Sequence, residues 1–176
     1  MELSKKDRVF LINQYQILKH IDIDPENIKY YEECIEILSN GYEIFYSTIY
    51  QSVCNDMLRT EGELVLEVLE FYSAVEHYKA ANPSDTDVNK HMWGHFHGFD
   101  HNEESEYLNF TNFLINKQGK FEEQKKYEKR TNRFNSHQPV VDIYRRMVAK
   151  WHSTGRNFLL SKEGILEILN SAQVVT

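Results

Sequence analysis

Half of the eight histidines in the chain fall within eleven residues, with the spacing H-x3-H-x-H-x3-H. The group consists of His91, His95, His97 and His101, with Asp100 next to the last. Imidazole nitrogens and a carboxylate suit zinc, nickel or copper, and residues at i and i+4, such as His91 and His95, share one helical face. The spacing therefore indicates one candidate chemistry, that of a metal-dependent hydrolase or nuclease.

The residues between these histidines favour a plainer interpretation. Gly94 and Gly98 interrupt any helix, so no single regular element would point all four imidazole rings the same way. Trp93, Phe96 and Phe99 would instead anchor a polar loop to the core. We therefore expect no cofactor, and we keep zinc or nickel at the histidine group as the alternative.

A second candidate is the basic segment 117–133, in which lysines and arginines are interleaved with Phe121 and Tyr127. Cations beside aromatic rings are typical of surfaces that bind single-stranded nucleic acid, and Lys125, Lys126 and Arg130 would carry that binding. The same segment holds glutamates at helical spacing from neighbouring lysines, which is typical of a solvated helix face. We favour the solvated face, and nucleic acid is not the expected partner.

The common catalytic signatures are missing from the sequence. It contains no nucleotide-binding glycine loop, no Walker motif and no nucleophile elbow, and its carboxylate pairs lie on helix faces expected to be exposed. These absences argue against an enzyme, although a Cys-His dyad assembled by the fold stays open. The polar side chains expected to converge on a ligand pocket are Asn13, His137, Arg146 and His152.

Helix start and stop signals indicate the elements that must position these side chains. The expected helix starts are Ser4, Asp24 before Pro25, Thr60 with Glu63, Asp100 with Glu103, Ser136 with Pro139 in the first turn, and Ser161. The expected stops are Asn40-Gly41, Asn82-Pro83, Gln118-Gly119 and Gly155. A third helix is predicted from Tyr42 to about Leu58, and residues 83–101 show no helical periodicity.

These signals predict an all-α protein of seven or eight short helices. No alternating strand pattern of convincing length and no internal repeat is present. The 176 residues, 41% of them hydrophobic, support one sizeable core, and we expect a single compact globular domain over residues 1–176. Ten Phe, eleven Tyr and two Trp exclude a disordered chain, and seven Gly with three Pro exclude a collagen-like one.

Charge is unevenly distributed along the chain. Residues 1–116 hold 21 acidic and 8 basic residues, whereas residues 117–176 hold 6 acidic and 12 basic ones. Such a split is typical of complementary surfaces within one fold, and also of a head-to-tail oligomer or a nucleic-acid face. Cys34 and Cys54 are expected as reduced, half-buried thiols, and no signal peptide or membrane span is apparent, so a cytoplasmic protein is expected.

Short motifs spread over nearly the whole chain resemble those of the YfbU family of small helical bacterial proteins. They are Arg8 with Leu11, Asn13, Gln14 and Tyr15; Gly41-Tyr42; Gly98-Phe99-Asp100 with Glu103 or Glu104 and Tyr107; Phe134-Asn135-Ser136-His137 with Pro139; and Tyr144, Arg146-Met147, Trp151-His152 and Leu160-Ser161. The resemblance implies a helical, cytoplasmic, self-associating protein, and a ligand-binding role has been suggested for the family. It provides no catalytic residues, and three of the clustered histidines lie outside the shared Gly-Phe-Asp motif.

Together these observations favour a self-associating helical module that binds a partner protein or a small ligand without catalysis. A homo-oligomer is the expected assembly, and no membrane is involved. Two alternatives stay open: metal-dependent hydrolysis at the histidine group and nucleic-acid binding through residues 117–133.

Overall fold

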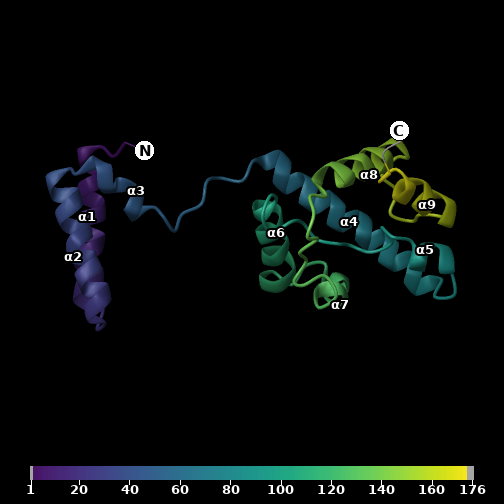
Figure 1. Cartoon of the computed structure of the whole chain (residues 1–176), viewed down its shortest axis with the longest axis horizontal. Helices are drawn as coiled ribbons and strands as arrows, with labels where there is room; N and C mark the ends of the chain where they lie inside the picture. The colour runs from purple at the N-terminus through teal and green to yellow at the C-terminus, as the bar shows by residue number, and fades with distance from the viewer. Residues whose placement is uncertain (1, 174–176) are drawn as a thin grey trace. The chain divides into compact units, whose positions relative to one another are not determined.

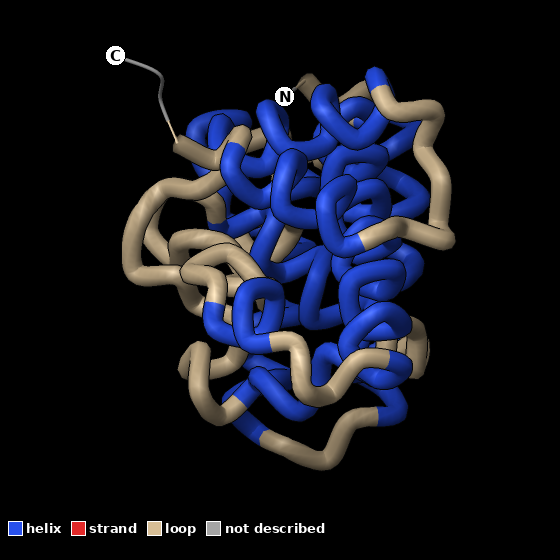
Figure 2. Tube along the Cα trace, turned by 90° about the vertical axis from the view of Figure 1, so that its right-hand side faces the viewer, coloured by secondary structure: helices blue, strands red, loops and turns tan. Residues whose placement is uncertain are grey.

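The computed structural model describes residues 2–173 (Figure 1). The elements are α1 (Lys5–Ile21), α2 (Pro25–Asn40), η1 (Glu43–Phe45), α3 (Tyr46–Ile49), α4 (Arg59–Ala81), α5 (Thr86–Lys90), α6 (Ser105–Asn112), the π-helical turn η2 (Phe113–Lys117), η3 (Glu122–Gln124), α7 (Lys125–Glu128), α8 (Val141–Ser153) and α9 (Lys162–Asn170). Helices and loops account for the whole described trace (Figure 2). The predicted all-α class is confirmed.

The chain divides into two compact units, unit 1 (Met1–Asp56) and unit 2 (Met57–Thr176). The single domain expected over residues 1–176 stays a prediction, because this division concerns only the contacts inside each unit. Among the helices of residues 2–173, none is long and apolar enough to cross a membrane.

Unit 1 is a hairpin of α1 and α2 with the short helices after it. The predicted starts are confirmed: the Ser4 hydroxyl accepts a hydrogen bond from the Asp7 backbone, and the Asp24 carboxylate caps α2. Gly41 ends α2 at φ 71°, and a Cβ there would lie 2.7 Å from the Arg8 guanidinium. Arg8 Nη1 donates to the Leu38 carbonyl at 3.0 Å, so this part of the motif ties α1 to the end of α2.

The prediction of a third helix from Tyr42 to about Leu58 is wrong. Only η1 and α3 form, and residues 50–58 have no helix. This stretch contains serine, asparagine, aspartate and a β-branched valine, which favour turns over helix interiors. The expected half-buried thiols are also wrong, because Cys34 is buried and Cys54 is exposed; both are free.

Unit 2 is built around α4, against which α6 and α8 pack (Figure 1). Tyr72 of α4 lies among aromatic rings, with centroids 5.7 Å from Phe96 and 6.0 Å from Tyr144. Trp93 and Phe99 are buried in the same core, as the sequence predicts. This aromatic core fixes the segment that follows α5, which has few regular backbone hydrogen bonds of its own.

Two of the predicted helix starts in unit 2, at Thr60 and at Asp100, are misplaced, since α4 begins at Arg59 and α6 at Ser105. Helix α4 begins at Arg59, and it is Glu61 that accepts a hydrogen bond from the Leu58 N–H, at 2.9 Å; Glu63 pairs with Arg59 instead. Residues 83–101, expected to lack helical structure, contain α5, which Asp85 caps. The stop at Asn82 and the Ser161 cap of α9 are confirmed.

The start of α8 depends on a residue far away in the sequence. The expected cap at Ser136 is wrong, since α8 begins at Val141. The buried Glu104 carboxylate accepts hydrogen bonds from the Val140 and Val141 N–H groups, each at 2.7 Å, and from the Asp100 N–H at 3.0 Å. A carboxylate at a helix N-terminus is favoured by the helix dipole, so Glu104 fixes α8 to the segment before α6.

Segments 98–100 and 134–136 lie side by side and are joined by backbone hydrogen bonds. The Phe99 N–H donates to the Phe134 carbonyl at 2.9 Å, and the Ser136 N–H donates to the Phe99 carbonyl at 3.2 Å. Gly98 has φ 86°, and a Cβ on it would lie 1.7 Å from the Phe134 oxygen. Only glycine fits at this crossing.

Candidate functional site

A polar hollow of about 630 Å³ opens in unit 2, between the end of α5, the segment after it and the loop after α7. We call it the histidine hollow. Its lining residues are Asn89, Lys90, His91, Met92, His95, His97, Arg130, Thr131, Asn135, Ser136 and His137. It thus gathers four of the eight histidines of the chain, and it combines residues that the sequence assigned to three separate candidate sites.

The loop that forms one wall of the histidine hollow has an uncommon backbone. Asn132, Arg133, Phe134 and His137 all have positive φ, between 46° and 62°. The Phe134 N–H donates to the Thr131 hydroxyl at 3.1 Å, and the Phe134 ring is buried in the core. Non-glycine residues in this region are strained and persist only where packing holds them, so the wall of the hollow is a fixed structure.

Two of the imidazoles are oriented by the backbone. His91 Nδ1 accepts a hydrogen bond from the Trp93 N–H at 3.1 Å, and its Nε2 lies 3.2 Å from the Asn170 side-chain oxygen. His97 Nε2 lies 2.8 Å from the Met92 carbonyl. In both rings the partners place the proton on Nε2, which leaves the His97 Nδ1 free to accept.

The His95 ring lies between two other rings. Its centroid is 4.3 Å from that of His97 and 5.1 Å from that of Tyr127. Burial is the main cause that lowers the pKa of His95 to about 4, and electrostatic repulsion from His97, Arg130 and Lys79 contributes to the same shift. Burial also lowers the pKa of His97. Both imidazoles are therefore neutral at pH 7.

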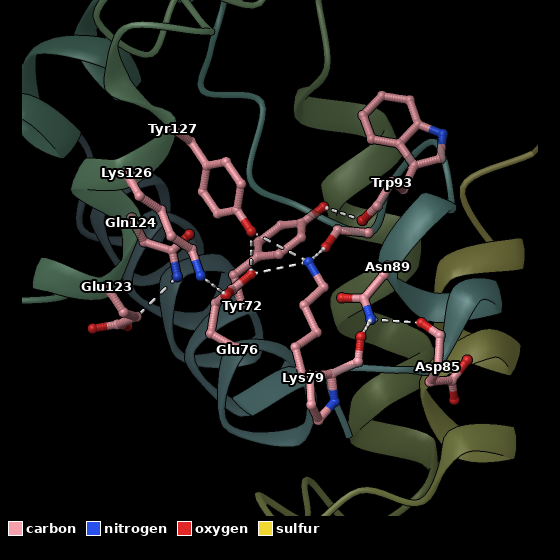
Figure 3. Close-up of polar contacts among 12 residues, drawn as sticks. Tyr72, Glu76, Lys79, Asp85, Asn89, Trp93, Glu123, Gln124, Lys126 and Tyr127 are labelled. Atoms are coloured by element: carbon pink, nitrogen blue, oxygen red, sulfur yellow. Dashed lines mark hydrogen bonds and ion pairs between the residues drawn. The ribbon is translucent and has the colours of Figure 1, made fainter. Parts of the chain in front are cut away.

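An ion network centred on the buried Glu76 includes Tyr127, whose ring lies against His95 of the hollow (Figure 3). The Glu76 carboxylate of α4 accepts hydrogen bonds from Lys79 at 3.0 Å, from the Tyr127 hydroxyl at 2.7 Å and from Lys126. Burial raises the pKa of Glu76, but the hydrogen bonds from Lys126 and Tyr127 together with the charge and hydrogen bond of Lys79 outweigh it and leave the pKa below its usual value. Lys79 also donates to the Gly94 carbonyl, which links α4 to the histidine segment.

The five residues expected to form a metal site are not all brought together. His91, His95 and His97 line the hollow, whereas the Asp100 carboxylate caps the backbone of Asn102 and Glu103, and His101 is exposed. Across residues 2–173, no group of three or more His, Cys, Asp or Glu side chains is placed to hold one metal ion.

Three of the four residues expected to form a ligand pocket belong to unit 2, and they are dispersed there. His137 lines the histidine hollow, but Arg146 donates to the Ala172 carbonyl at 2.8 Å, and His152 Nε2 lies 3.1 Å from a Glu67 oxygen. In unit 1, Asn13 is exposed on α1 beside an apolar hollow of about 720 Å³. The structure therefore leaves His137, Arg146 and His152 without a common pocket in unit 2.

The three residues expected to bind nucleic acid have different surroundings. Lys125 pairs with Glu122 at 2.9 Å, and Lys126 binds the buried Glu76. Arg130 lines the histidine hollow instead. These side chains do not form one continuous cationic strip.

Sequence reasoning missed Lys90 and the role of Asn135 in this site. The Asn135 side-chain oxygen accepts hydrogen bonds from the His101 N–H at 3.2 Å and the His137 N–H at 3.0 Å. The Asn-Ser pair before the proline indicated a helix cap, and only the fold reveals that Asn135 holds two loops together. Lys90 stands alone in its segment and carries no pattern signal.

A second unusual surface lies on unit 1, where α1 is apolar on two sides. Leu11, Ile12 and Tyr15 pack toward the unit 1 core. Phe10, Ile17 and Ile21, which recur at the spacing of another helical face, are 65%, 55% and 67% exposed. We call these three residues the α1 outer face.

Two comparisons with known proteins give matches that cover nearly the whole chain. A family model described as the YfbU domain matches residues 1–171. The UPF0304 protein MJECS11 of Methanocaldococcus jannaschii is 45% identical over 171 residues, which cover 96% of this chain and 99% of that protein. Neither description names an activity or a ligand.

Proposed function

Since the chain belongs to the YfbU family, we propose that it acts as a family-typical helical module whose unit 1 pairs with unit 1 of a second copy. The module has no catalytic role of its own in this proposal. Its compartment is the cytoplasm, where the free thiols of Cys34 and Cys54 stay reduced.

The α1 outer face is the observation that carries this proposal. A surface helix normally presents one apolar stripe to its own core and polar residues to water. Helix α1 has an apolar stripe toward α2 and a second one, of Phe10, Ile17 and Ile21, that unit 1 leaves exposed. Full burial of such side chains is worth about 1.5–3 kcal/mol each, which favours covering this face in an assembly.

The charges of unit 1 indicate a second copy as the occupant of this face. Helix α1 carries four basic residues and one acidic residue, whereas α2 carries four acidic residues and one basic residue. Lys19 of α1 already pairs with Glu32 of α2 at 2.6 Å within the hairpin. In a two-fold symmetric pair, α1 of each copy can face α2 of the other. The basic residues of α1 then lie opposite the acidic residues of α2 at two equivalent contacts.

The test is the mass of the protein in solution, measured by light scattering after size exclusion at micromolar concentration. We expect twice the 21.0 kDa chain mass for the natural protein and the single-chain mass for the double variant Ile17→Asp with Ile21→Asp. A matched control places the same charges on unit 2, at Met92→Asp and Leu159→Asp, whose side chains are 71% and 76% exposed.

The control variant should keep the doubled mass, and circular dichroism should show native helix content in both variants. A natural protein of single-chain mass would overturn the proposal. So would an α1 variant that keeps the doubled mass while the unit 2 control loses it.

A further inference from the structure

The histidine hollow has an excess of hydrogen-bond donors and positive charge. None of its eleven lining residues is a carboxylate, although the chain as a whole carries 27 acidic and 20 basic residues. Two of the lining residues, Lys90 and Arg130, take part in no ion pair with another residue in the range 2–173. Lys125 and Lys126, by contrast, each pair with a glutamate.

The Asn135 side chain adds a donor of fixed orientation. Its oxygen is held by the two backbone N–H groups of His101 and His137, so the amide cannot turn over without losing both bonds. The Nδ2 group then has no acceptor within the described part of the chain, although Asn135 lines the hollow. The strained loop from Asn132 to His137 holds this amide in place.

The groups behind the hollow add to its positive charge. The network around Glu76 contributes two ammonium groups, from the largely buried Lys79 and the exposed Lys126, against a single carboxylate. His95 contributes a neutral ring that stacks on His97 and lies tilted against Tyr127. An anion entering the hollow therefore meets donors and no carboxylate on its lining.

We propose that the histidine hollow binds a small phosphorylated molecule, with its phosphate held by Arg130, Lys90 and the Asn135 amide. A guanidinium with no carboxylate partner suits the paired oxygens of a phosphate group. The volume of about 630 Å³ lies within the range of small-molecule sites and leaves room for an organic portion beside the His95–His97 stack. This site belongs to unit 2 and does not rest on the pairing of unit 1.

The experiment is calorimetric titration of the full chain with inorganic phosphate and with adenosine monophosphate, at pH 7 and constant ionic strength maintained with chloride. We expect saturable binding of one molecule per chain. Arg130→Gln should weaken the binding of both probes by about tenfold or more, because the guanidinium charge that donates hydrogen bonds to the anion is lost. The matched control is Lys129→Gln, which removes the neighbouring exposed cation that does not line the hollow.

Asn135→Asp provides a second variant that tests the proposal without depending on Arg130. The aspartate keeps both acceptor bonds from His101 and His137, but it replaces the free amide donor with a negative charge. Binding of both probes should be lost while circular dichroism stays native. Imidazole NMR signals should confirm the location, with phosphate-induced shifts at His95 and His137.

Several results would overturn the proposal. These are the absence of saturable binding of either probe, an equal loss in Lys129→Gln and Arg130→Gln, and retained binding in Asn135→Asp. Tighter binding of a single-stranded oligonucleotide without a terminal phosphate, with a steep salt dependence, would replace it with a nucleic-acid surface. Citrate binding as tight as that of phosphate would overturn the phosphate class. The mass of the protein is measured separately, so failure here is distinguishable from failure of the unit 1 pairing.

Discussion

Replacement of Glu104 by alanine should be among the most destabilising single changes in unit 2. The carboxylate is buried and accepts hydrogen bonds from the backbone of Asp100, Val140 and Val141. A hydrogen bond to a charged group contributes about 1.5–3 kcal/mol, and a buried donor left without a partner costs about 1–3 kcal/mol. Three such hydrogen bonds at the low end of their range sum to about 4.5 kcal/mol. We expect Glu104→Ala to lower the free energy of unfolding by about 4 kcal/mol, because water reaches some of the freed donors.

Glu104→Gln should have an intermediate effect. The amide keeps one oxygen for the Val140 and Val141 donors, but its nitrogen faces the Asp100 N–H, and the charge that favours the helix dipole is lost. We expect Glu104→Gln to lower the free energy of unfolding by about 2 kcal/mol, which places its stability between those of the natural protein and the alanine variant.

The assay is urea unfolding followed by tryptophan fluorescence. Trp93 and Trp151, the two tryptophans of the chain, are both buried in the core of unit 2, so the signal reports that unit. Glu103→Ala is the matched control, since that neighbouring side chain is exposed, and it should change the free energy by less than about 0.5 kcal/mol. The reasoning fails if Glu104→Ala costs less than about 1 kcal/mol, or if the control costs as much.

Two further predictions concern the backbone crossing and the pH dependence of stability. Gly98→Ala should prevent stable folding of unit 2, because its Cβ would lie 1.7 Å from the Phe134 oxygen. Gly155 has the same φ of 86° but open space around it, so Gly155→Ala should cost only about 1–2 kcal/mol of unfolding free energy, measured by urea unfolding. Similar costs for the two variants would contradict the steric argument. The folded pKa of His95, about 4, lies below its ordinary value, so the unfolded chain binds the proton more readily and stability falls as the pH decreases from 7 toward 4. His95→Gln should remove about 1–2 kcal/mol of that loss between pH 7 and pH 5, and a similar effect of the exposed His101→Gln would refute the assignment.

The elements that could be predicted from sequence are those whose signals are local. Ser4, Asp24 and Ser161 cap helices within three residues of themselves, and Gly41 ends a helix by its own conformation. Such signals depend on neighbouring backbone groups alone. The start of α8 was mispredicted because its capping carboxylate, Glu104, is supplied from a distant part of the chain.

The candidate site could be predicted only in parts. The histidine group indicated a polar loop anchored by aromatic residues, and the structure places His91, His95 and His97 there. Arg130 and His137 reach the same hollow from a segment more than thirty residues later, and no spacing rule connects them. Tertiary packing, not pattern, brings the three segments together.

The capping of α8 by Glu104 also has a kinetic consequence. The contact closes a loop of 36 residues, so its entropy cost must be met before the cap forms. A helix of 13 residues without a cap is marginal in water. Helix α8 therefore gains its stability together with the long-range structure of unit 2, and its formation is coupled to the docking of the segment around residues 100–104.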